Sequence, residues 1–248
     1  MNNQNNDYDF LKAHLWEQLG NGPTDQKRGL APPPIQKPAP EDAPLVNLTP
    51  ITGSNLGDMP VREAIARRAS RRQYTGEALT LPELSYLLWS TQGIRHKVHG
   101  THSVTRNVPS AGARHPFETY ILANKVMDLP LGLYRYLPLT HQLCQLRTDP
   151  EITEEIHQAS YMQYVLESAV VFIWTTIPYR TAWRYGPLAP KLIAQDSGHL
   201  CQNLYLACES INIGTCAIGA YNQVEMDQIL AVDGEAEFTI YMATVGKI

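Results

Sequence analysis

The spacing of apolar residues changes near Met59. Beyond that point apolar positions recur with the periods of helices and strands, which predicts a packed body. A first helix is expected there, with Asp58 as its N-cap and Pro60 in its first turn. Its apolar positions at helical spacing are Val61, Ala64, Ile65 and Ala69.

A second helix is predicted directly afterwards. Thr80 is its expected N-cap, and Glu83, three residues later, completes a capping box, with Pro82 near the first turn. Its apolar face consists of Leu81, Leu84, Leu87 and Leu88. Several independent signals therefore specify where this helix begins.

Several later segments have the pattern of β-strands. Residues 117–124 are rich in β-favouring residues, and residues 132–136, ended by Pro138, are expected to be their hairpin neighbour. Residues 169–176 form a continuous apolar run, as in a central strand that is buried on both faces. Residues 238–245 are expected to form the terminal strand.

Between the last two strands, residues 190–211 have the pattern of a long helix that closes at Gly214. Small residues at positions 214–221 then predict a loop. Helices in series with a few strands, without regular βαβ alternation, indicate an α+β fold rather than a doubly wound sheet.

The first 48 residues differ from the body. Residues 10–19 form a short amphipathic stretch that ends at glycines, which stop a helix cheaply. Seven of the chain's 18 prolines lie between Ala31 and Pro50, where they favour an extended path. Because this segment cannot make its own core, it either extends into solvent or wraps over the body. We therefore expect two parts: an N-terminal helix with a proline-rich extension (1–48) and one folded domain (49–248).

Composition excludes several classes of protein. The 248 residues, 44% of them hydrophobic, are enough for a sizeable core. Lys+Arg 20 against Asp+Glu 24 gives a net charge of −4, so no overall basic field is available for nucleic acid or an anionic membrane. No apolar run approaches the ~20 residues of a spanning helix, and the first residues lack the features of a secretory signal. We therefore expect a cytoplasmic protein.

The four cysteines form no C-x-x-C pair and are expected to be small core residues in a reducing compartment. They are Cys144, Cys201, Cys208 and Cys216. The run His96, His99 and His102 superficially suggests a metal site, but without a nearby carboxylate or cysteine it is interpreted as a solvent-facing loop, and no metal is expected. His199 is expected to be hydrogen-bonded and partly buried, whereas His115 is either a substrate contact or a simple replacement.

The most distinctive segment runs Arg67-Arg68-Ala69-Ser70-Arg71-Arg72-Gln73-Tyr74. Where the chain leaves the helix and becomes extended, residues two apart point the same way, so Arg68, Ser70 and Arg72 can converge on one side. Guanidinium groups and a hydroxyl in that arrangement suit a phosphate. The other interpretation is a solvated basic face that pairs with acids elsewhere, and charge pattern alone does not separate the two.

Three further segments contain small residues that would let a ligand approach the backbone. They are the turn at 107–118 (NVPSAGARHPFE), the stretch 214–221 (GTCAIGAY) and the terminal Val245-Gly246-Lys247. The Lys247 ammonium could add a phosphate contact. Each segment alone is weak evidence of a site.

Taken in order along residues 48–248, these segments resemble the nitroreductase superfamily of FMN enzymes, and within it the SagB/ThcOx-type dehydrogenases that oxidise azolines in ribosomal peptides. R-x-S-x-R-x-Y at 68–74 looks like the family's phosphate and ribityl motif, and P-S-A-G-A-x-x-P-x-E-x-Y at 109–120 is close to the subfamily's flavin-edge turn. G-L-Y-x-Y at 132–136 and G-H-x-x-Q-N-L at 198–204 are similar to its hairpin and helix. The ordered set is specific, although R-x-S-x-R alone is common.

The resemblance implies an α+β nitroreductase-like fold, with a central mixed sheet flanked by helices, in an intertwined homodimer that binds FMN at the subunit interface. The implied cofactor contacts are Arg68, Ala69, Ser70 and Arg72 of one chain and Pro109, Ser110, Ala111 and Gly112 of the other. Facing the reactive ring edge, with backbone N–H near the flavin N5, would be Ala217, Ile218 and Gly219. Lys247 would complete the phosphate site.

The resemblance also implies a catalytic pair. Peptide azoline dehydrogenases carry Lys-Tyr before the long helix, implicated as the acid/base, and the corresponding residues here are Arg184 and Tyr185. Arginine is effectively always protonated, so Arg184 can bind an anion or stabilise charge but is a poor base. Tyr185 can donate or accept a proton in a dry pocket, and the alternative is that it only packs.

Three functions remain as alternatives. The subfamily motifs favour a SagB-type dehydrogenase that transfers hydride from a small-molecule or peptide substrate to flavin N5. The second is an NAD(P)H-dependent nitro- or quinone reductase, for which the chain has no dinucleotide G-x-G-x-x-G motif, although transient NAD(P)H binding over the flavin needs none. The third is a non-catalytic flavin-binding partner subunit.

Overall fold

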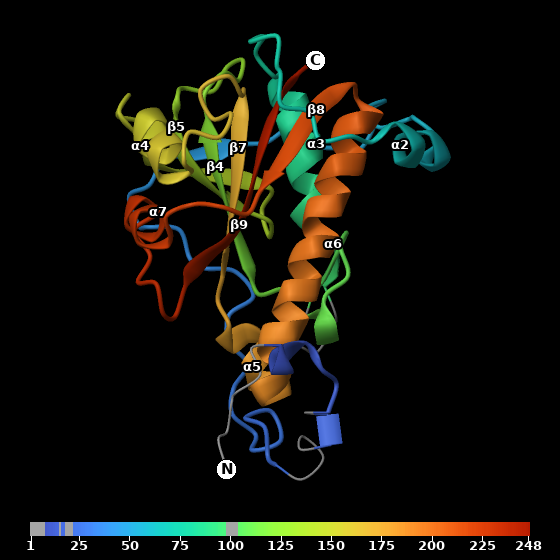
Figure 1. Cartoon of the computed structure of the whole chain (residues 1–248), viewed down its shortest axis with the longest axis vertical. Helices are drawn as coiled ribbons and strands as arrows, with labels where there is room; N and C mark the ends of the chain where they lie inside the picture. The colour runs from blue at the N-terminus through green and yellow to red at the C-terminus, as the bar shows by residue number, and fades with distance from the viewer. Residues whose placement is uncertain (1–7, 15, 18–21, 98–103) are drawn as a thin grey trace.

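The structure is a computed structural model that describes residues 8–14, 16–17, 22–97 and 104–248. A seven-stranded sheet lies at its centre with helices on both faces (Figure 1). In spatial order, the strands are β1 (Leu45–Asn47), β6 (Gln142–Arg147), β5 (Gly132–Leu137), β4 (Phe117–Ala123), β7 (Val170–Thr176), β9 (Phe238–Lys247) and β8 (Ile213–Ile218). A separate hairpin pairs β2 (Ile94–Lys97) with β3 (Val104–Arg106).

The strand pairs of the large sheet are all antiparallel. The expectation of a mixed sheet is therefore wrong for this chain, since parallel pairing is limited to isolated bridges such as Ser70↔Thr215. Short turns join β4 to β5 and β5 to β6, and such turns can connect only antiparallel neighbours. The predicted α+β class is confirmed.

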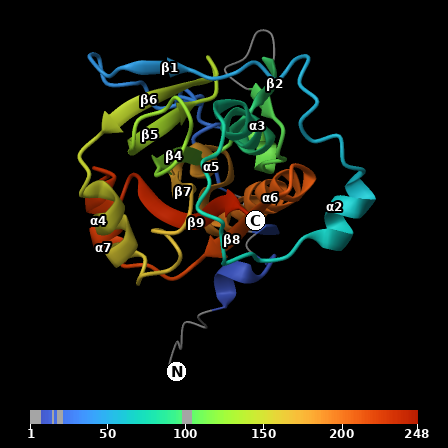
Figure 2. The same cartoon turned by 90° about the horizontal axis from the view of Figure 1, so that it is seen from above.

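The helices form one layer on each face of the sheet. They are α2 (Val61–Arg67), α3 (Leu81–Gln92), α4 (Ile152–Ala159), α5 (Tyr179–Tyr185), α6 (Ala189–Ser210) and α7 (Gln223–Ile229), with short 3-10 turns η1 (Asp9–Leu11), η2 (Ala111–Ala113) and η3 (Gly186–Leu188). Viewed from above, α3 and α6 cover one face while α4 and α7 cover the other (Figure 2).

The central strand β7 contacts both layers. Phe172 and Trp174 belong to the core beneath α3 and α6, whereas Val171 and Ile173 belong to the core beneath α4 and α7. All four side chains are fully buried. The prediction of a central strand buried on both faces is confirmed.

Local signals place α3 and α6 as predicted. The Thr80 hydroxyl accepts from the Glu83 N–H at 3.3 Å, while a Glu83 carboxylate oxygen accepts from the Thr80 N–H at 2.8 Å, which completes the capping box. The long helix α6 covers the predicted segment within one residue at each end.

Helix α2 differs from its prediction. Pro60 is the N-cap, so Asp58 does not cap the helix, and Ala69 lies beyond its end. Ala64 is buried against the body, but Val61 and Ile65 are 68% and 59% exposed. The apolar face that the spacing predicts is therefore only partly covered within one chain.

The loop predicted at 214–221 is wrong, because most of it lies in strand β8. Ile213 through Ile218 pair with β9, and β8 forms one edge of the sheet. The β-branched residues Ile213, Thr215 and Ile218 supply the strand preference that the neighbouring glycines obscured. Of the predicted ring-facing residues, Ala217 and Ile218 lie in this strand and Gly219 follows it.

The amphipathic stretch at 10–19 forms a 3-10 turn over Asp9–Leu11, after which Lys12 is extended. A continuous helix from residue 10 is therefore not observed, and its predicted apolar positions Leu15 and Leu19 lie outside the described residues. Phe10 and Trp16 are about half exposed, at 45% and 47%. A short isolated helix without a core to pack against is marginal, which accounts for the difference.

The proline-rich segment wraps over the body. Three buried arginines donate to backbone carbonyls of residues 30–40, which we call the strap: Arg180 Nε to Pro34 O (2.8 Å), Arg106 Nη2 to Ile35 O (2.7 Å) and Arg135 Nη2 to Pro38 O (2.6 Å). An extended proline-rich chain makes no internal hydrogen bonds, so its carbonyls need donors from elsewhere. Of the two conformations that the sequence allowed, the chain adopts the wrapped one.

Further sequence predictions concern membrane spans, metal sites, cysteines and histidines. Within the described ranges, no helix is long and apolar enough to cross a membrane, and no group of three or more potential ligands could hold a metal. All four cysteines are free and buried, which confirms their prediction as core residues. His96 lies exposed in β2, whereas His99 and His102 lie outside the described residues.

Candidate functional site

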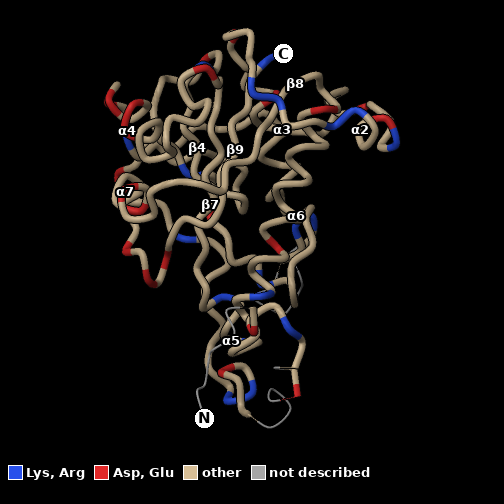
Figure 3. The backbone as a smooth tube through the Cα atoms, viewed as in Figure 1, with Lys and Arg blue, Asp and Glu red and all other residues tan. Residues whose placement is uncertain are grey.

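The extended segment after α2 lies along the free edge of β8. Ser70 bridges Thr215, and the Arg71 N–H donates to the Thr215 carbonyl at 2.9 Å. The segment therefore continues the sheet by a few residues, with Ala69 half-buried and Ser70 exposed. Lys and Arg positions gather here and again around α5 (Figure 3).

The four arginines of this segment fall into two sets. Arg67 and Arg71 reach the buried carboxylate of Glu209, with nitrogen–oxygen distances of 3.1 and 3.8 Å. Arg68 and Arg72 have no carboxylate partner in the part of the chain that the structure describes. Both interpretations of the segment therefore apply. The charges of Arg67 and Arg71 are matched by an acid, and those of Arg68 and Arg72 remain available to an anion.

Tyr205 of α6 connects the arginine segment to β8. Its hydroxyl lies 2.9 Å from the Ser70 Oγ and accepts a hydrogen bond from the Ala217 N–H at 2.9 Å. The Arg68 guanidinium lies over its ring, 5.4 Å from the centroid. Arg68 and Ser70 therefore face the same side chain, and Ala217 belongs to the same cluster.

Sequence reasoning did not find Tyr205. A usable signal was present, because Tyr205 directly follows the G-H-x-x-Q-N-L segment and shares one helix face with its Gly198 and Gln202 at i, i+4, i+7 spacing. Ala217 is one of three residues that the resemblance places at the ring edge, and its N–H donates to the Tyr205 hydroxyl in this chain.

We expect Tyr205→Phe to weaken flavin retention severalfold. The variant keeps the ring under Arg68 but loses both hydroxyl contacts, each worth about 0.5–1.5 kcal/mol. Flavin affinity measured by fluorescence titration checks this, with Tyr221→Phe, which removes a hydroxyl bond to Thr239 on the other side of the sheet, as the control. Equal flavin affinity for Tyr205→Phe and wild type would contradict the linking role.

A second cluster forms at the other half of α6. The Ser110 hydroxyl donates to Asp196 Oδ2 at 2.6 Å, and the Ala111 N–H donates to the same oxygen at 3.1 Å. Ser110 Oγ also accepts from the His115 N–H at 2.9 Å. Burial raises the pKa of Asp196, an effect opposed by these two donors. The turn at 109–112, with Pro109 exposed at its start, is thus fixed to α6 through one carboxylate.

Gly112 brings this turn against the predicted catalytic pair. Its φ is +57°, and a Cβ added there would lie 2.6 Å from the Tyr185 hydroxyl oxygen and 3.0 Å from the Arg184 Nε. A Cβ would strain the backbone at this positive φ and would displace the ends of the Tyr185 and Arg184 side chains, so glycine suits the position. The structure therefore places the turn at 109–112 and the Arg184–Tyr185 pair side by side.

The two members of the pair differ in exposure. Tyr185 is half-buried at the end of α5, with its ring edge-on to Trp16 at 6.1 Å, while Arg184 is exposed and lies 5.5 Å from the Tyr185 centroid. Neither side chain makes a hydrogen bond to any described residue. The Tyr185 hydroxyl is therefore available for proton exchange with a ligand.

Other predicted residues are placed differently. The Lys247 ammonium pairs with Glu83 of the α3 capping box, so its charge is already matched, and a phosphate contact would require breaking that pair. Glu83 has a lowered pKa: burial acts to raise it, but Lys247 and Thr80 outweigh that effect. Ile218 is buried in the core under α4 and α7, and Gly219 is exposed with open space around it.

The two clusters lie apart within one chain. Tyr205 marks the first and Asp196 the second, nine positions apart on α6, which is about 13 Å along the helix axis. No described contact joins Arg68 or Ser70 to the turn at 109–112.

The histidines near these clusters also differ from expectation. His199 is exposed, and its Nδ1 lies 3.7 Å from Asp196, too far for a hydrogen bond, so the prediction of a hydrogen-bonded, partly buried residue is wrong. His115 is buried, and burial together with the nearby Arg106 lowers its pKa to about 3. It is therefore neutral in the folded protein.

We expect this neutral histidine to make the protein less stable in mild acid. Its ordinary pKa is 6.5, so as pH falls from about 6.5 toward 3 the unfolded chain takes up a proton that the folded chain does not. Because the His115 φ is +46°, His115→Asn keeps a residue that tolerates this backbone while removing the titration. Urea midpoints from pH 7 to 4 should fall less steeply for the variant, and an unchanged slope would contradict the assignment.

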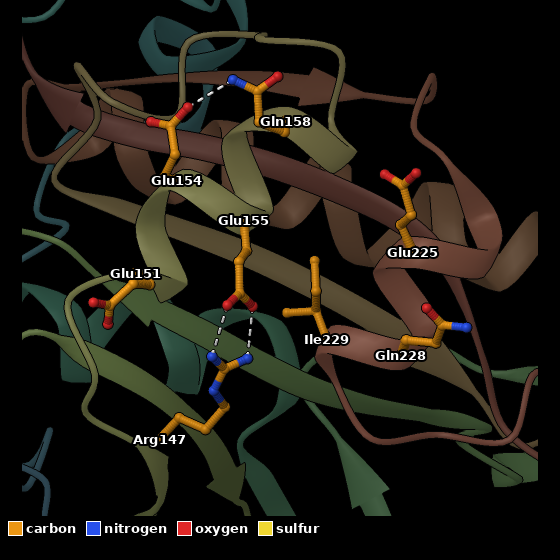
Figure 4. Close-up of a pocket in the computed structure, with 8 residues that line it drawn as sticks. All are labelled: Arg147, Glu151, Glu154, Glu155, Gln158, Glu225, Gln228 and Ile229. Atoms are coloured by element: carbon orange, nitrogen blue, oxygen red, sulfur yellow. Dashed lines mark hydrogen bonds and ion pairs between the residues drawn. The ribbon is translucent and has the colours of Figure 1, made fainter.

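A separate cavity of about 740 Å³ lies between α4 and α7, on the opposite face of the sheet (Figure 4). Arg147 binds Glu155 there with both terminal nitrogens, while Glu151, Glu154 and Glu225 leave three further carboxylates around the opening. A phosphate would be repelled by this lining. We therefore place no flavin in this cavity.

Comparisons with known proteins show the family of the chain. A protein of Methanocaldococcus jannaschii named as a nitroreductase is 28% identical over 194 residues, which cover 78% of this chain and 93% of that protein. The trifolitoxin-processing protein TfxB of Rhizobium leguminosarum is 24% identical over 155 residues, 60% of this chain and 41% of TfxB. Residues 65–247 match the model of the Nitroreductase family. The chain belongs to the Nitroreductase family and is a flavin-dependent oxidoreductase.

Solved structures show the same fold. A crystal structure from Anabaena variabilis, described as a nitroreductase, aligns with a TM-score of 0.66 at 27% identity, over 84% of this chain and 42% of that chain. The Escherichia coli microcin synthetase McbBCD complex aligns at 0.60 and 16% identity, over 95% and 81%. The NADPH:FMN oxidoreductase of Vibrio harveyi aligns at 0.53 and 18% identity, over 75% and 68%. This chain spans less than half of TfxB and of the Anabaena chain.

Proposed function

We propose that the protein is an FMN-dependent dehydrogenase of the SagB type. The observation that carries the proposal is the cluster of Arg68, Ser70 and Ala217 around Tyr205, in which the cation has no carboxylate partner among the described residues. A phosphorylated cofactor supplies the missing negative charge.

The residues present fit an FMN phosphate. Arg68 and Arg72 offer guanidinium groups, and Ser70 offers a short hydroxyl donor, a combination that suits a phosphate dianion. Lys247 fits less well, because Glu83 already matches its charge. We therefore assign the phosphate to the arginine–serine–arginine segment. Lys247, at the end of β9, is assigned to the ion pair with Glu83 at the start of α3.

A second copy of the chain completes the proposed site. The two clusters lie about 13 Å apart along α6, so one ligand held by Arg68 meets the turn at 109–112 most readily from a partner. Val61 and Ile65 leave an apolar face uncovered, and a side chain at Gly198 of α6 would meet open space. These uncovered surfaces support the homodimer with FMN at its interface.

The Arg184–Tyr185 pair supplies the polar chemistry beside the ring. Bound FMN would supply the hydride acceptor. Tyr185, with its hydroxyl held next to Gly112, can take or return the proton that accompanies substrate oxidation. Arg184 remains charged and stabilises negative charge that develops nearby.

Two relatives support the SagB-type substrate class. TfxB is named for processing trifolitoxin, and the McbBCD structure is of a microcin synthetase with a truncated pro-MccB17 bound. The first name describes processing and the second a synthetase with a bound precursor form, so a peptide substrate of the SagB type is our first choice. Because McbBCD is a complex, the role of a partner subunit is a further candidate for this chain.

A plain NAD(P)H-dependent nitro- or quinone reductase is the second candidate. It is favoured by the Vibrio NADPH:FMN oxidoreductase, which was solved with NAD⁺, and by Arg184 in place of the lysine of azoline dehydrogenases. A non-catalytic flavin-binding subunit would bind FMN and leave every electron donor unused.

Anaerobic spectroscopy of the purified protein tests these alternatives. Visible flavin absorbance, with FMN released on denaturation, is expected in each case, and a colourless protein that FMN does not stabilise would contradict all three. Rapid bleaching by NADPH favours the reductase, bleaching by an azoline peptide favours the dehydrogenase, and neither favours the subunit.

We expect Tyr185→Phe to slow substrate-dependent bleaching by about 100-fold while retaining the flavin. Tyr179→Phe is the matched control, because Tyr179 lies on the same helix and its hydroxyl donates to Asp25, away from the turn at 109–112. An unchanged rate of bleaching in Tyr185→Phe would contradict the proton-transfer role and show that Tyr185 only packs.

A further inference from the structure

Arg114 is a buried cation without a hydrogen-bond partner. Its side chain is only 3% exposed, yet its guanidinium makes no hydrogen bond or ion pair within the described residues, and its Nε is an orphaned buried atom. Its described contact is with the face of Trp183, 5.0 Å from the ring centroid. Leaving the buried Nε of Arg114 without an acceptor is costly, so the arrangement suits an acceptor that a ligand supplies.

The buried carboxylate near this region is already occupied. Glu118 binds Arg180 at 2.5 Å and also accepts from the Lys37 N–H at 2.8 Å. Asp196 is likewise engaged with Ser110 and Ala111. Neither acid therefore compensates Arg114, and the missing acceptor has to come from outside the described chain.

Arg184 and Tyr185 belong to the same neighbourhood as Arg114. Burial lowers the pKa of Arg114, and the charge of Arg184 lowers it further. Arg184 and Tyr185 both lie against the Cβ position of Gly112, two residues before Arg114. Arg184 has no acid partner in the described ranges either. Arg114 packs on Trp183, and the next two residues of α5, Arg184 and Tyr185, lie against Gly112 of the turn. Two guanidinium groups without an acid partner among the described residues therefore lie in one neighbourhood.

We propose that Arg114 and Arg184 bind a carboxylate group of the substrate beside the turn at 109–112. This inference rests on the proposed function, because it specifies the substrate class of the same site. A carboxylate has two oxygens that accept forked bonds from guanidinium groups, and the Tyr185 hydroxyl can then reach the neighbouring atoms of the substrate. The carboxylate belongs either to a free organic acid or to the C-terminus of a peptide.

Calorimetric titration of the purified holoprotein tests the proposal without turnover. Benzoate represents a free acid and hippurate a peptide C-terminus, with benzamide and hippuramide as neutral counterparts of the same shape. We expect at least one carboxylate to bind about tenfold more tightly than its amide. The better of the two acids identifies which source the site prefers.

Variants separate the site from general charge effects. Arg184→Met is exposed and bonded to no described group, so it should fold normally and lose most of the preference for the carboxylate. Arg114→Met should lose it as well, and Arg114→Lys should restore part of it. Arg62→Met, on the exposed surface of α2, should leave the preference unchanged.

Two results overturn the inference. One is equal affinity of wild type for each acid and its amide, and the other is a preference that survives in both Arg184→Met and Arg114→Met. The flavin content of the same samples is measured separately. A yellow protein that bleaches with its electron donor but ignores the carboxylate contradicts this inference alone, whereas a colourless protein contradicts the proposed function.

Discussion

Arg68→Ala is expected to weaken FMN binding by roughly 10- to 100-fold. Hydrogen bonds between charged groups contribute about 1.5–3 kcal/mol each, and every 1.4 kcal/mol corresponds to about a factor of ten. Arg68 makes no ion pair with a described carboxylate, so its removal disturbs no internal charge balance. Equilibrium dialysis or fluorescence titration of the apoprotein with FMN measures the change.

The matched control is Arg62→Ala. Arg62 lies on the exposed surface of α2, a turn and a half before Arg68. Its substitution by alanine removes the same charge as Arg68→Ala. It should leave FMN affinity within about twofold, since screening reduces distant surface charges. If both variants lost equal affinity, a general field rather than a phosphate contact would be responsible; if neither did, the phosphate assignment would be wrong.

Arg180→Met is expected to lower the free energy of unfolding by about 3–5 kcal/mol, the cost of leaving one partner of a buried ion pair alone. Arg180 is 2% exposed and binds Glu118 at 2.5 Å, and its Nε donates to Pro34 O of the strap at 2.8 Å. The substitution therefore leaves a buried carboxylate uncompensated and releases one tether of the strap. For a chain of this size we expect the thermal midpoint to fall by about 6–20 °C.

Two other variants serve as comparisons for the stability of Arg180→Met. Arg147→Met breaks a two-acid cluster with Asp149 and Glu155, but that cluster is partly exposed, so a loss of under about 1 kcal/mol is expected. The double variant Arg180→Met/Glu118→Met removes both buried charges and should recover part of the stability. A single variant as stable as Arg147→Met would contradict the importance of the buried pair. Limited proteolysis of residues 30–40 reports separately on the strap.

The sequence predicted best those features whose partners lie a few residues apart. The capping box joins Thr80 to Glu83, and the apolar run of β7 carries its two-sided burial in its own composition. Arg68 and Ser70, two residues apart, face the same side chain, as the two-residue period of an extended chain predicts. Helix α2 shows the limit of this reasoning, because periodicity predicts an apolar face without showing what covers it.

The features that sequence reasoning missed depend on distant partners. Tyr205 lies 135 positions from the serine that it touches, and Lys247 lies 164 positions from Glu83. Long side chains can reach many groups, and only the packed arrangement decides which one they meet. For the same reason, the charge pattern could not divide the arginines into paired and unpaired sets.

By itself, the amino-acid sequence determined the α+β class, the helices and strands with strong local signals, and the ordered motifs that place the chain in its family. The tertiary structure alone decided that arginines from three separate elements hold the strap, that Gly112 meets Tyr185, and that Arg114 lacks an acceptor. The physical reason is range. Backbone conformation and capping are set by neighbours within one or two turns, whereas the charge balance of a buried group is set by every element that folds around it.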